Sequence, residues 1–321
     1  MGRIEIDLIA AYPPSGTTGH ARAALEREQV RGIWTEFAAA WAGPARTDLT
    51  RLREAYEQLC QRRAPSAGVG ARSVDADGVQ CLRIGDNPQR VILFAHGGGF
   101  TLGSARGYLG AARTLAAAAE ADVLVPDYRL APEHPFPAGL DDLCSAHRWL
   151  LAQGTPAERI AFVGDGSGGG LILSALLALR DAGDALPTVA VCLSPWLDCT
   201  LRSPSMVTHS DRDPAMSIAQ LAWSARAYLQ GTEPTNPYVG PAFGDLRGLP
   251  PLLTLVGSEE VLLEENLRFA DRARSHGVDA RLHVGLEQTH AWPLFGSTLN
   301  AGRLAVDAVG RFIAGHCGWG A

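Results

Sequence analysis

Hydrophobic and polar positions divide the chain into two parts with different periodicity. In residues 21–41 and 48–63, apolar side chains recur at i, i+3 and i+4, a spacing typical of amphipathic helices. From residue 71 onward, short apolar runs alternate with helical patterns. The runs predict eight strands, namely Ala71–Val74, Val79–Ile84, Val91–Ala95, Asp122–Pro126, Ile160–Val163, Val189–Leu193, Leu252–Val256 and Ala280–Val284.

Helical patterns separate the later strands. They are predicted at Ala111–Ala119, Ala138–Ala152, Gly169–Ala182, Leu262–Ser275 and Ala301–Ala314. Two strands joined by a short turn, followed by β-α-β-α units, indicate an α/β fold with a mostly parallel eight-stranded sheet and helices on both faces. The loops after the carboxyl ends of such strands lie along one edge of the sheet, where ligands normally bind.

Two segments fall outside this alternation and are expected to cover that edge as a cap. One is the N-terminal part, residues 1–65, which is too small for a separate domain. The other is Trp196–Arg247, which is too long for a simple loop and contains one helical pattern at Ser217–Leu229. We therefore predict a single domain over residues 1–321 with a cap from 1–65 and 196–247.

Composition narrows the classes of function. The net charge is −6 with no block of like charges, so neither nucleic acid nor an anionic membrane surface is an expected partner. All 28 basic residues are arginine, which excludes Schiff-base chemistry and a P-loop lysine. The six cysteines show no metal-like spacing with histidine, so they are interpreted as reduced thiols and no metal or organic cofactor is implied.

The location of the protein is predicted from two further features. Residues 1–7 carry acidic side chains where a signal peptide needs an apolar run. No apolar stretch reaches the roughly 18 residues that a membrane span requires. We expect a cytoplasmic protein; its oligomeric state, homodimer included, stays open.

Two glycine-rich segments directly follow predicted strands. His96-Gly97-Gly98-Gly99-Phe100 follows Val91–Ala95, and its glycines let backbone N–H groups approach a ligand oxygen, which predicts an oxyanion hole. Gly164-Asp165-Gly166-Ser167-Gly168-Gly169 lies between a strand and a helix. This is the setting of a nucleophile elbow, in which small residues on both sides permit a strained turn.

Candidate acid–base residues follow the last two strands. These loops contain Gly257-Ser258-Glu259-Glu260 and Gln288-Thr289-His290-Ala291-Trp292. The register from Gly257 favours Glu260 over Glu259 as the acid. Phe100 and Trp292, each beside a motif, are the candidate pocket residues. The other tryptophans considered for the pocket are interpreted as core residues, namely Trp34, Trp41, Trp196 and Trp223.

These motifs resemble those of the hormone-sensitive-lipase-like carboxylesterases over roughly residues 91–314. Two further segments contribute to the resemblance, namely Asp127-Tyr128-Arg129-Leu130-Ala131-Pro132-Glu133 and Ser194-Pro195-Trp196-Leu197-Asp198. The resemblance implies an α/β-hydrolase fold and attack of a serine on a small or medium acyl ester. It implies His290 as general base and Glu260 as the acid that orients it, where the family more often has Asp. Gly98, Gly99 and the residue after the nucleophile would donate to the oxyanion.

One departure affects the nucleophile itself. The family's elbow reads G-D-S-A-G-G, and the matching residues on both sides place Gly166 at the nucleophile position and Ser167 at the oxyanion-binding position. Three interpretations stay open. Ser167 acts as the nucleophile, although Asp165 would then stand where the strained turn needs glycine. Alternatively, glycine replaces a natural serine at 166, or Gly166 is natural.

A natural Gly166 still leaves groups that can perform chemistry. The His290–Glu260 pair and the oxyanion hole suit a β-elimination, a cyclisation or a dehydration, and a water activated by His290 could attack directly. Loss of a triad serine leaves only about 10³–10⁴-fold catalysis over water, so hydrolysis by this chain is expected to be poor. Besides an esterase and a non-hydrolytic enzyme, a third possible class is a protein that only binds a ligand. The presence of the proton-transfer pair argues against this class.

Overall fold

A nine-stranded sheet forms the centre of the computed structural model, which describes residues 6–9, 17–42, 48–64 and 70–319. The strand order is β1-β9-β8-β7-β6-β4-β5-β3-β2. The strands are β1 (Ile6–Ile9), β2 (Ala71–Ala76), β3 (Val79–Ile84), β4 (Val91–Ala95), β5 (Asp122–Pro126), β6 (Ile160–Asp165), β7 (Val189–Leu193), β8 (Leu252–Gly257) and β9 (Ala280–Gly285).

The sheet contains all eight predicted strands and one more. β2–β3 and β3–β5 pair antiparallel, and the other neighbouring strands pair in parallel. The ninth strand, β1, lies at the edge with Ile6 opposite Leu282 of β9, so the prediction of eight strands was one too few. Every residue of the central strands β4, β5, β7 and β8 is buried, as expected where helices cover both faces of a parallel sheet.

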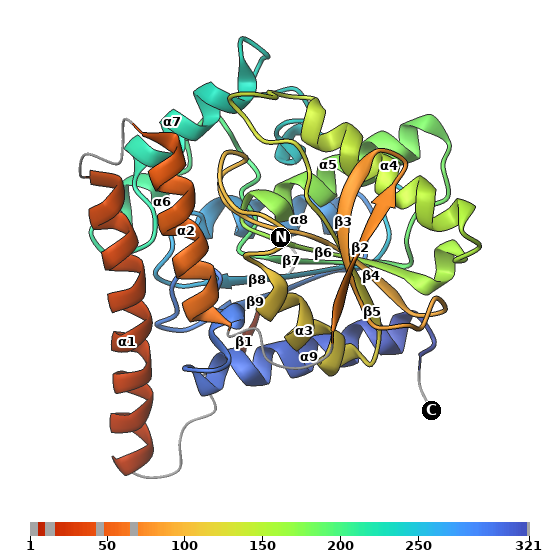
Figure 1. Ribbon diagram of the computed structural model, residues 1–321. Coiled ribbons are helices and arrows are strands. Elements are labelled where there is room, and N and C mark those ends of the chain that lie inside the picture. Colours follow the sequence, from red (N-terminus) through yellow and green to blue (C-terminus); the bar gives the residue numbers. More distant parts are fainter. Residues whose placement is uncertain (1–5, 10–16, 43–47, 65–69, 320–321) are drawn as a thin grey trace.

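Helices cover the two faces of the sheet in separate layers (Figure 1). α3 and α9 lie on one face, and α4, α5 and α8 lie on the other. The helices are α1 (Thr17–Ala42), α2 (Leu49–Arg63), α3 (Leu109–Ala119), α4 (Ala138–Ala152), α5 (Ser167–Ala182), α6 (Ser205–Thr208), α7 (Ile218–Leu229), α8 (Leu263–Ser275) and α9 (Asn300–His316). Short 3₁₀ turns occur at Ala157–Arg159, Pro241–Phe243 and Trp292–Phe295.

The helices α1, α2, α6 and α7 lie together at one side of the sheet (Figure 1). The two cap segments contact each other through aromatic rings, since Trp41 of α1 meets Trp223 of α7 edge-on at 5.1 Å between ring centroids. Ser217 caps the start of α7, because the side chains of Ser217 and Gln220 form a reciprocal capping box. Of the predicted cap, residues 1–5, 10–16, 43–47 and 65 lie outside the described residues.

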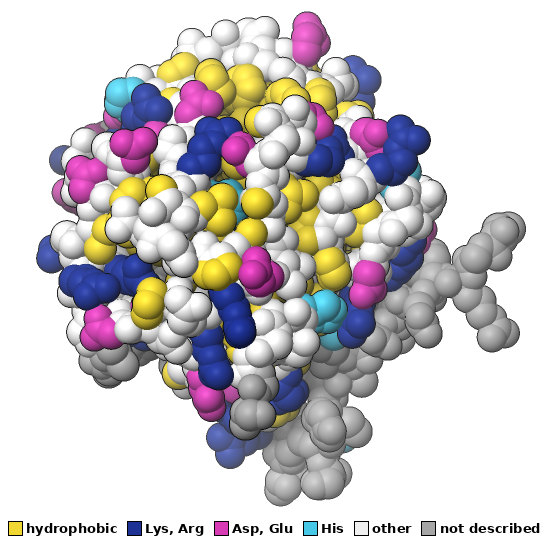
Figure 2. Space-filling model, turned by 90° about the vertical axis from the view of Figure 1, so that its right-hand side faces the viewer, with side chains coloured by type: hydrophobic (Ala, Val, Ile, Leu, Met, Phe, Trp, Pro, Cys, Tyr) yellow, Lys and Arg dark blue, Asp and Glu magenta, His cyan; other side chains and the backbone are white. Residues whose placement is uncertain are grey.

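The surface carries charges of both signs. On the face turned away from α1, arginines and acidic residues are interspersed between apolar side chains (Figure 2). All six cysteines are buried free thiols. Within the described ranges, no helix combines the length and apolar character needed to cross a membrane.

Candidate active site

The turn between β6 and α5 has the geometry of a nucleophile elbow. Gly166 separates the strand from the helix and has φ 54° and ψ −118°, a conformation that residues with a side chain rarely adopt. A Cβ atom added to Gly166 would lie 3.1 Å from Nε2 of His290. Position 166, rather than 167, therefore faces the imidazole.

His290 and Glu260 meet although they come from different loops. His290 follows β9, and its Nδ1 lies 2.9 Å from Oε2 of Glu260, which follows β8. Glu260 is fully buried and His290 is 7% exposed. Because Nδ1 is engaged by the carboxylate, Nε2 is the nitrogen left to exchange a proton with a bound molecule. Glu259 instead forms an ion pair with Arg212 at the surface, away from the imidazole.

Ser194 holds the glutamate and the histidine loop together. Its Oγ donates a 2.6 Å hydrogen bond to Oε1 of Glu260 and accepts one from the backbone N–H of Ala291 at 3.0 Å. Ser194 is fully buried, and both Ser194 (φ 48°) and Ala291 (φ 53°) adopt left-handed backbone conformations. Such conformations cost about 1–3 kcal/mol each, so the surrounding fold must enforce this arrangement. The sequence motif around Ser194 does not by itself predict this hydrogen-bonding role.

The candidate oxyanion donors come from two elements. Ser167 is the first residue of α5, so its backbone N–H has no acceptor within the helix. The loop after β4 supplies Gly98 and Gly99; Gly98 has φ 121°, and a Cβ added there would meet the carbonyl oxygen of Leu102 at 2.2 Å. The Oγ of Ser167 accepts a hydrogen bond from the Phe100 N–H at 3.1 Å, which links the two elements.

Ser167 is thus oriented differently from a nucleophile. Its hydroxyl is engaged by the oxyanion loop, and no hydrogen bond joins it to His290 in the described part of the chain. The serine still lines the cavity. The geometry therefore favours an oxyanion-binding position for Ser167 over the alternative nucleophile.

A buried charge pair lies beneath the elbow and was not predicted. Asp165, fully buried, accepts a 2.5 Å hydrogen bond from the Tyr108 hydroxyl, and Nη1 of Arg63 lies 3.6 Å from its carboxylate. Arg63 ends α2 and is 1% exposed, with its guanidinium over the rings of Trp34, Tyr56, Tyr108 and Phe295. A cap residue therefore neutralises an elbow residue. Nothing in the sequence around Arg63 distinguishes it from surface arginines of an amphipathic helix.

The surroundings shift the proton affinity of His290. Burial opposes a positive charge on the imidazole, but the hydrogen bond and the negative charge of Glu260 outweigh burial and raise the pKa of His290. Asp213, between α6 and α7, lies near the same pair. Burial, followed by the charge of Glu260, raises the pKa of Asp213 to about 6, although it accepts a backbone hydrogen bond from Val261.

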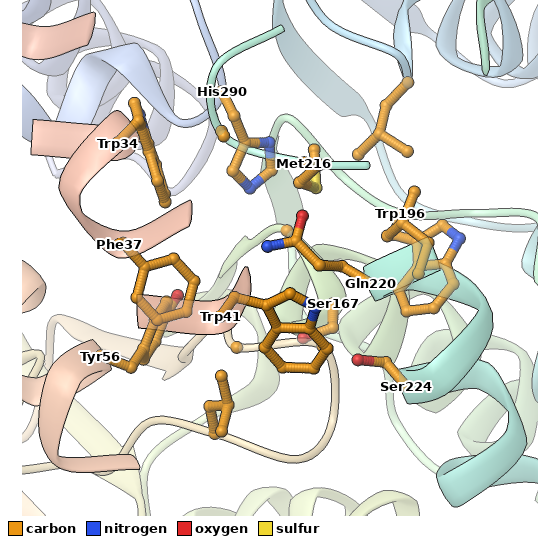
Figure 3. Close-up of a pocket in the computed structure, with 17 residues that line it drawn as sticks. Trp34, Phe37, Trp41, Tyr56, Ser167, Trp196, Met216, Gln220, Ser224 and His290 are labelled. Carbon is orange, nitrogen blue, oxygen red and sulfur yellow. The ribbon is translucent and has the colours of Figure 1, made fainter. Parts of the chain in front are cut away.

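A cavity opens onto Gly166 and His290. Five Trp, Phe and Tyr side chains line it, and most of the lining residues come from the cap (Figure 3). The lining residues include Trp34, Phe37 and Trp41 of α1, Tyr56 of α2, Trp196, and Met216, Gln220 and Ser224 of the second cap segment. Trp34, Phe37 and Trp41 share one face of α1 because they are spaced by three and four residues.

The predicted pocket residues do not line this cavity. Phe100 turns into the core, where its ring stacks on Tyr228 at 3.9 Å. Trp292 is 1% exposed and packs against Gly285. The prediction was wrong because proximity in sequence to a motif does not fix side-chain direction. Three tryptophans interpreted as core, Trp34, Trp41 and Trp196, line the cavity instead, while Trp223 does not.

No group of three or more His, Cys, Asp or Glu side chains among the described residues could hold a metal ion. The polar groups at the cavity are suited to proton transfer and to hydrogen bonding with an oxygen that carries negative charge.

Comparisons with known proteins support the fold. A family model described as alpha/beta hydrolase fold matches residues 92–294. An acetyl-hydrolase from Streptomyces hygroscopicus is 42% identical over 231 residues, which cover 72% of this chain and 77% of that protein. An esterase from Acinetobacter venetianus is 34% identical over 247 residues, or 76% of this chain and 80% of that protein.

Solved structures resemble the chain over most of its length. An esterase from the bacterial hormone-sensitive lipase family has a TM-score of 0.87 and 38% identity, covering 91% of this chain and 98% of that chain. EstE5, solved after a soak with p-nitrophenyl butyrate, has a TM-score of 0.84 and 34% identity, covering 91% of this chain and 99% of that chain.

Proposed function

Because the chain belongs to the hormone-sensitive-lipase-like carboxylesterases of the α/β-hydrolase fold, we propose that it binds a small or medium acyl ester and hydrolyses it slowly, with water in place of the serine nucleophile. The observation that carries this proposal is the relation between Gly166 and His290. Nε2 of His290 would lie 3.1 Å from a Cβ atom added at position 166, and Nδ1 of the same ring is hydrogen-bonded to Glu260. The general base is therefore complete while the nucleophile is absent.

The proposed reaction is a single displacement. Nε2 of His290 takes a proton from a water molecule as the water oxygen attacks the ester carbonyl carbon. The carbonyl oxygen becomes an oxyanion held by the N–H groups of Gly98, Gly99 and Ser167. The tetrahedral intermediate then collapses, the C–O bond to the alcohol breaks, and protonated His290 donates its proton to the leaving alkoxide. No covalent intermediate with the protein forms.

The rate should be low for a physical reason. A side-chain hydroxyl at 166 would be held in place by the chain, whereas a water molecule must be ordered for each turnover. Without the serine, catalysis rests on the oxyanion donors, the base and substrate binding, for which about 10³–10⁴-fold acceleration over water is typical.

Hydrolysis of p-nitrophenyl acetate and butyrate tests this proposal. The chain as written, Gly166→Ser and Gly166→Ala are compared side by side. We expect Gly166→Ser to increase kcat/KM by at least about 10²-fold, because it restores a positioned nucleophile next to its base. Gly166→Ala is the matched control, since it adds the same Cβ without a hydroxyl. Should all three remain inert although folded, the site has been adapted to other chemistry, and eliminations and cyclisations become the reactions to assay.

A further inference from the structure

The space beside Gly166 points to a ligand class other than esters. We propose that this site binds a monocarboxylate with an apolar or aromatic side group. One carboxylate oxygen would accept hydrogen bonds from the oxyanion loop, and the other would occupy the space that glycine leaves in front of His290. This inference goes beyond the proposed hydrolysis, because it concerns equilibrium binding and needs no turnover.

The first argument is the free nitrogen of His290. The side chain is nine-tenths buried, with 9% exposed, and Nδ1 is taken by Glu260. Nε2 has no hydrogen-bond partner among the described residues and points into the cavity beside position 166. A serine at 166 would fill this space with its own oxygen. With glycine, an oxygen atom of a ligand can take that place.

The second argument is the pair of oxygen-binding groups. Gly98, Gly99 and Ser167 line the cavity at the oxyanion loop and the first turn of α5, and they carry the proposed N–H donors. α5 has 16 residues, and the positive end of its dipole favours an anion there. His290 lines another part of the same cavity. An ester has one oxygen suited to this pair of groups, whereas a carboxylate has two equivalent acceptors that can engage both at once.

The third argument is charge balance. The charged and titratable groups that face His290 are Glu260 from the loop after β8, Asp165 at the end of β6 and Asp213 from the cap. The ring of Trp34 covers His290 from α1 at 5.6 Å between ring centroids. Arg63 offsets Asp165 at 3.6 Å. Glu260 has no such arginine among the described residues, so an added carboxylate requires a proton on Nε2 to avoid like-charge repulsion.

The aromatic wall indicates the rest of the ligand. Trp34, Phe37 and Trp41 enclose the cavity beside His290 (Figure 3). The amide oxygen of Gln220 accepts a 2.7 Å hydrogen bond from the Ser217 N–H, so its NH₂ group is the part available to the cavity. Apolar surfaces with few polar groups favour butyrate- or phenylacetate-like acids over small hydrophilic ones.

Isothermal titration calorimetry with phenylacetate and butyrate tests the proposal on the chain as written. Titrations in two buffers with different ionisation enthalpies report the protons taken up on binding. At pH values above the pKa of His290, we expect uptake of about one proton per carboxylate and an affinity that falls about tenfold per pH unit. Phenylacetamide, which has nearly the same shape and no charge, should bind at least about tenfold more weakly and without proton uptake.

Three variants identify the groups involved. Gly166→Ala puts a methyl group into the proposed oxygen site and should weaken phenylacetate binding at least about tenfold while changing phenylacetamide binding less. His290→Gln removes the proton acceptor and should abolish proton uptake. Asp213→Asn removes the neighbouring carboxyl, which could itself take up a proton, and should leave the uptake in place. The phenylacetamide comparison needs no variant, so it decides the matter even where a variant does not fold.

Several outcomes would overturn the inference. These are no phenylacetate binding by the folded chain, equal affinity for acid and amide, binding independent of pH, or proton uptake that persists in His290→Gln. None of them depends on ester hydrolysis. If carboxylates do not bind but Gly166→Ser hydrolyses esters, only this inference is wrong. If carboxylates bind but Gly166→Ser does not hydrolyse esters, only the proposed function is wrong.

Discussion

The two halves of the site differ in how complete they are. In the nucleophile half, the elbow keeps its turn but carries Gly166, so the strained position has no side chain. In the proton-transfer half, hydrogen bonds join Glu260 to His290 and to Ser194, and Ser194 and Ala291 adopt left-handed backbone conformations. Strain and a buried carboxylate both reduce stability. The proton-transfer half therefore carries both costs, whereas glycine at 166 has no side chain to strain in the other half.

Among the substitutions in the proton-transfer half, removing the charge of Glu260 should have the largest effect on kcat. In a Gly166→Ser background, Glu260→Gln should lower kcat by about 10³–10⁴-fold, because the imidazole loses its orientation and its charge stabilisation. His290 must be neutral to act as a base, so activity falls as the pH drops through its raised pKa. Without Glu260, burial lowers that pKa, and the acid limb of the pH–rate profile should move to lower pH. A limb that stays in place would mean that Glu260 does not set the pKa of His290.

The buried pair under the elbow offers the largest stability effect. Arg63→Met removes the charge that faces Asp165 and should reduce the free energy of unfolding by about 3–5 kcal/mol, because a buried carboxylate loses its counter-charge. Urea unfolding measures this. Arg212→Met, which breaks the surface pair with Glu259, is the control and should change stability by about 0–1 kcal/mol. Equal effects of the two substitutions would show that burial does not strengthen the first pair.

The role of Ser194 within the proton-transfer half can be tested by substitution. In the Gly166→Ser background, Ser194→Ala should reduce kcat by about 10–100-fold, because Glu260 and the Ala291 N–H both lose a partner. Ser205 is the matched control, since it is also buried and also donates to one group and accepts from a backbone N–H, with the Ser203 hydroxyl as a third partner, but does not contact Glu260. Ser205→Ala should lower thermal stability without a comparable loss of kcat. A similar loss of kcat in both would assign Ser194 a purely structural role.

The smallest expected effect concerns the elbow itself. Gly166→Ala should reduce stability by about 1–2 kcal/mol, because φ 54° and ψ −118° disfavour any Cβ. Gly183→Ala at the other end of α5 has φ 78° and ψ 16° with open space around it, and therefore gives a reference cost for a positive φ without a close contact. Calorimetric melting of both variants separates this cost from the contact with His290. An unchanged stability of Gly166→Ala would contradict the view that glycine avoids strain at the elbow.

The parts of the molecule differed in how far the sequence predicted them. Strand positions were predictable because buried parallel strands are continuous apolar runs, and the loops after β4, β6, β8 and β9 carry motifs with fixed spacing. Contacts between distant segments were not predictable. Arg63 meets Asp165 across 102 positions, and Ser194 meets Glu260 across 66. The cavity wall was misassigned because aromatic residues at helical spacing fit a buried core and a ligand pocket equally well, as Trp34 and Trp41 demonstrate.

The central claim is that only one side-chain oxygen is missing from an otherwise complete esterase site. Intact-protein mass spectrometry, after acid quench during turnover of p-nitrophenyl butyrate, tests it most directly. We predict that Gly166→Ser carries one butyryl group in the steady state, lost when His290 is also replaced, and that the chain as written carries none. A butyryl group on the chain as written would show that another residue, Ser167 foremost, is the nucleophile. No acylation of folded Gly166→Ser, together with no gain in hydrolysis, would contradict the claim.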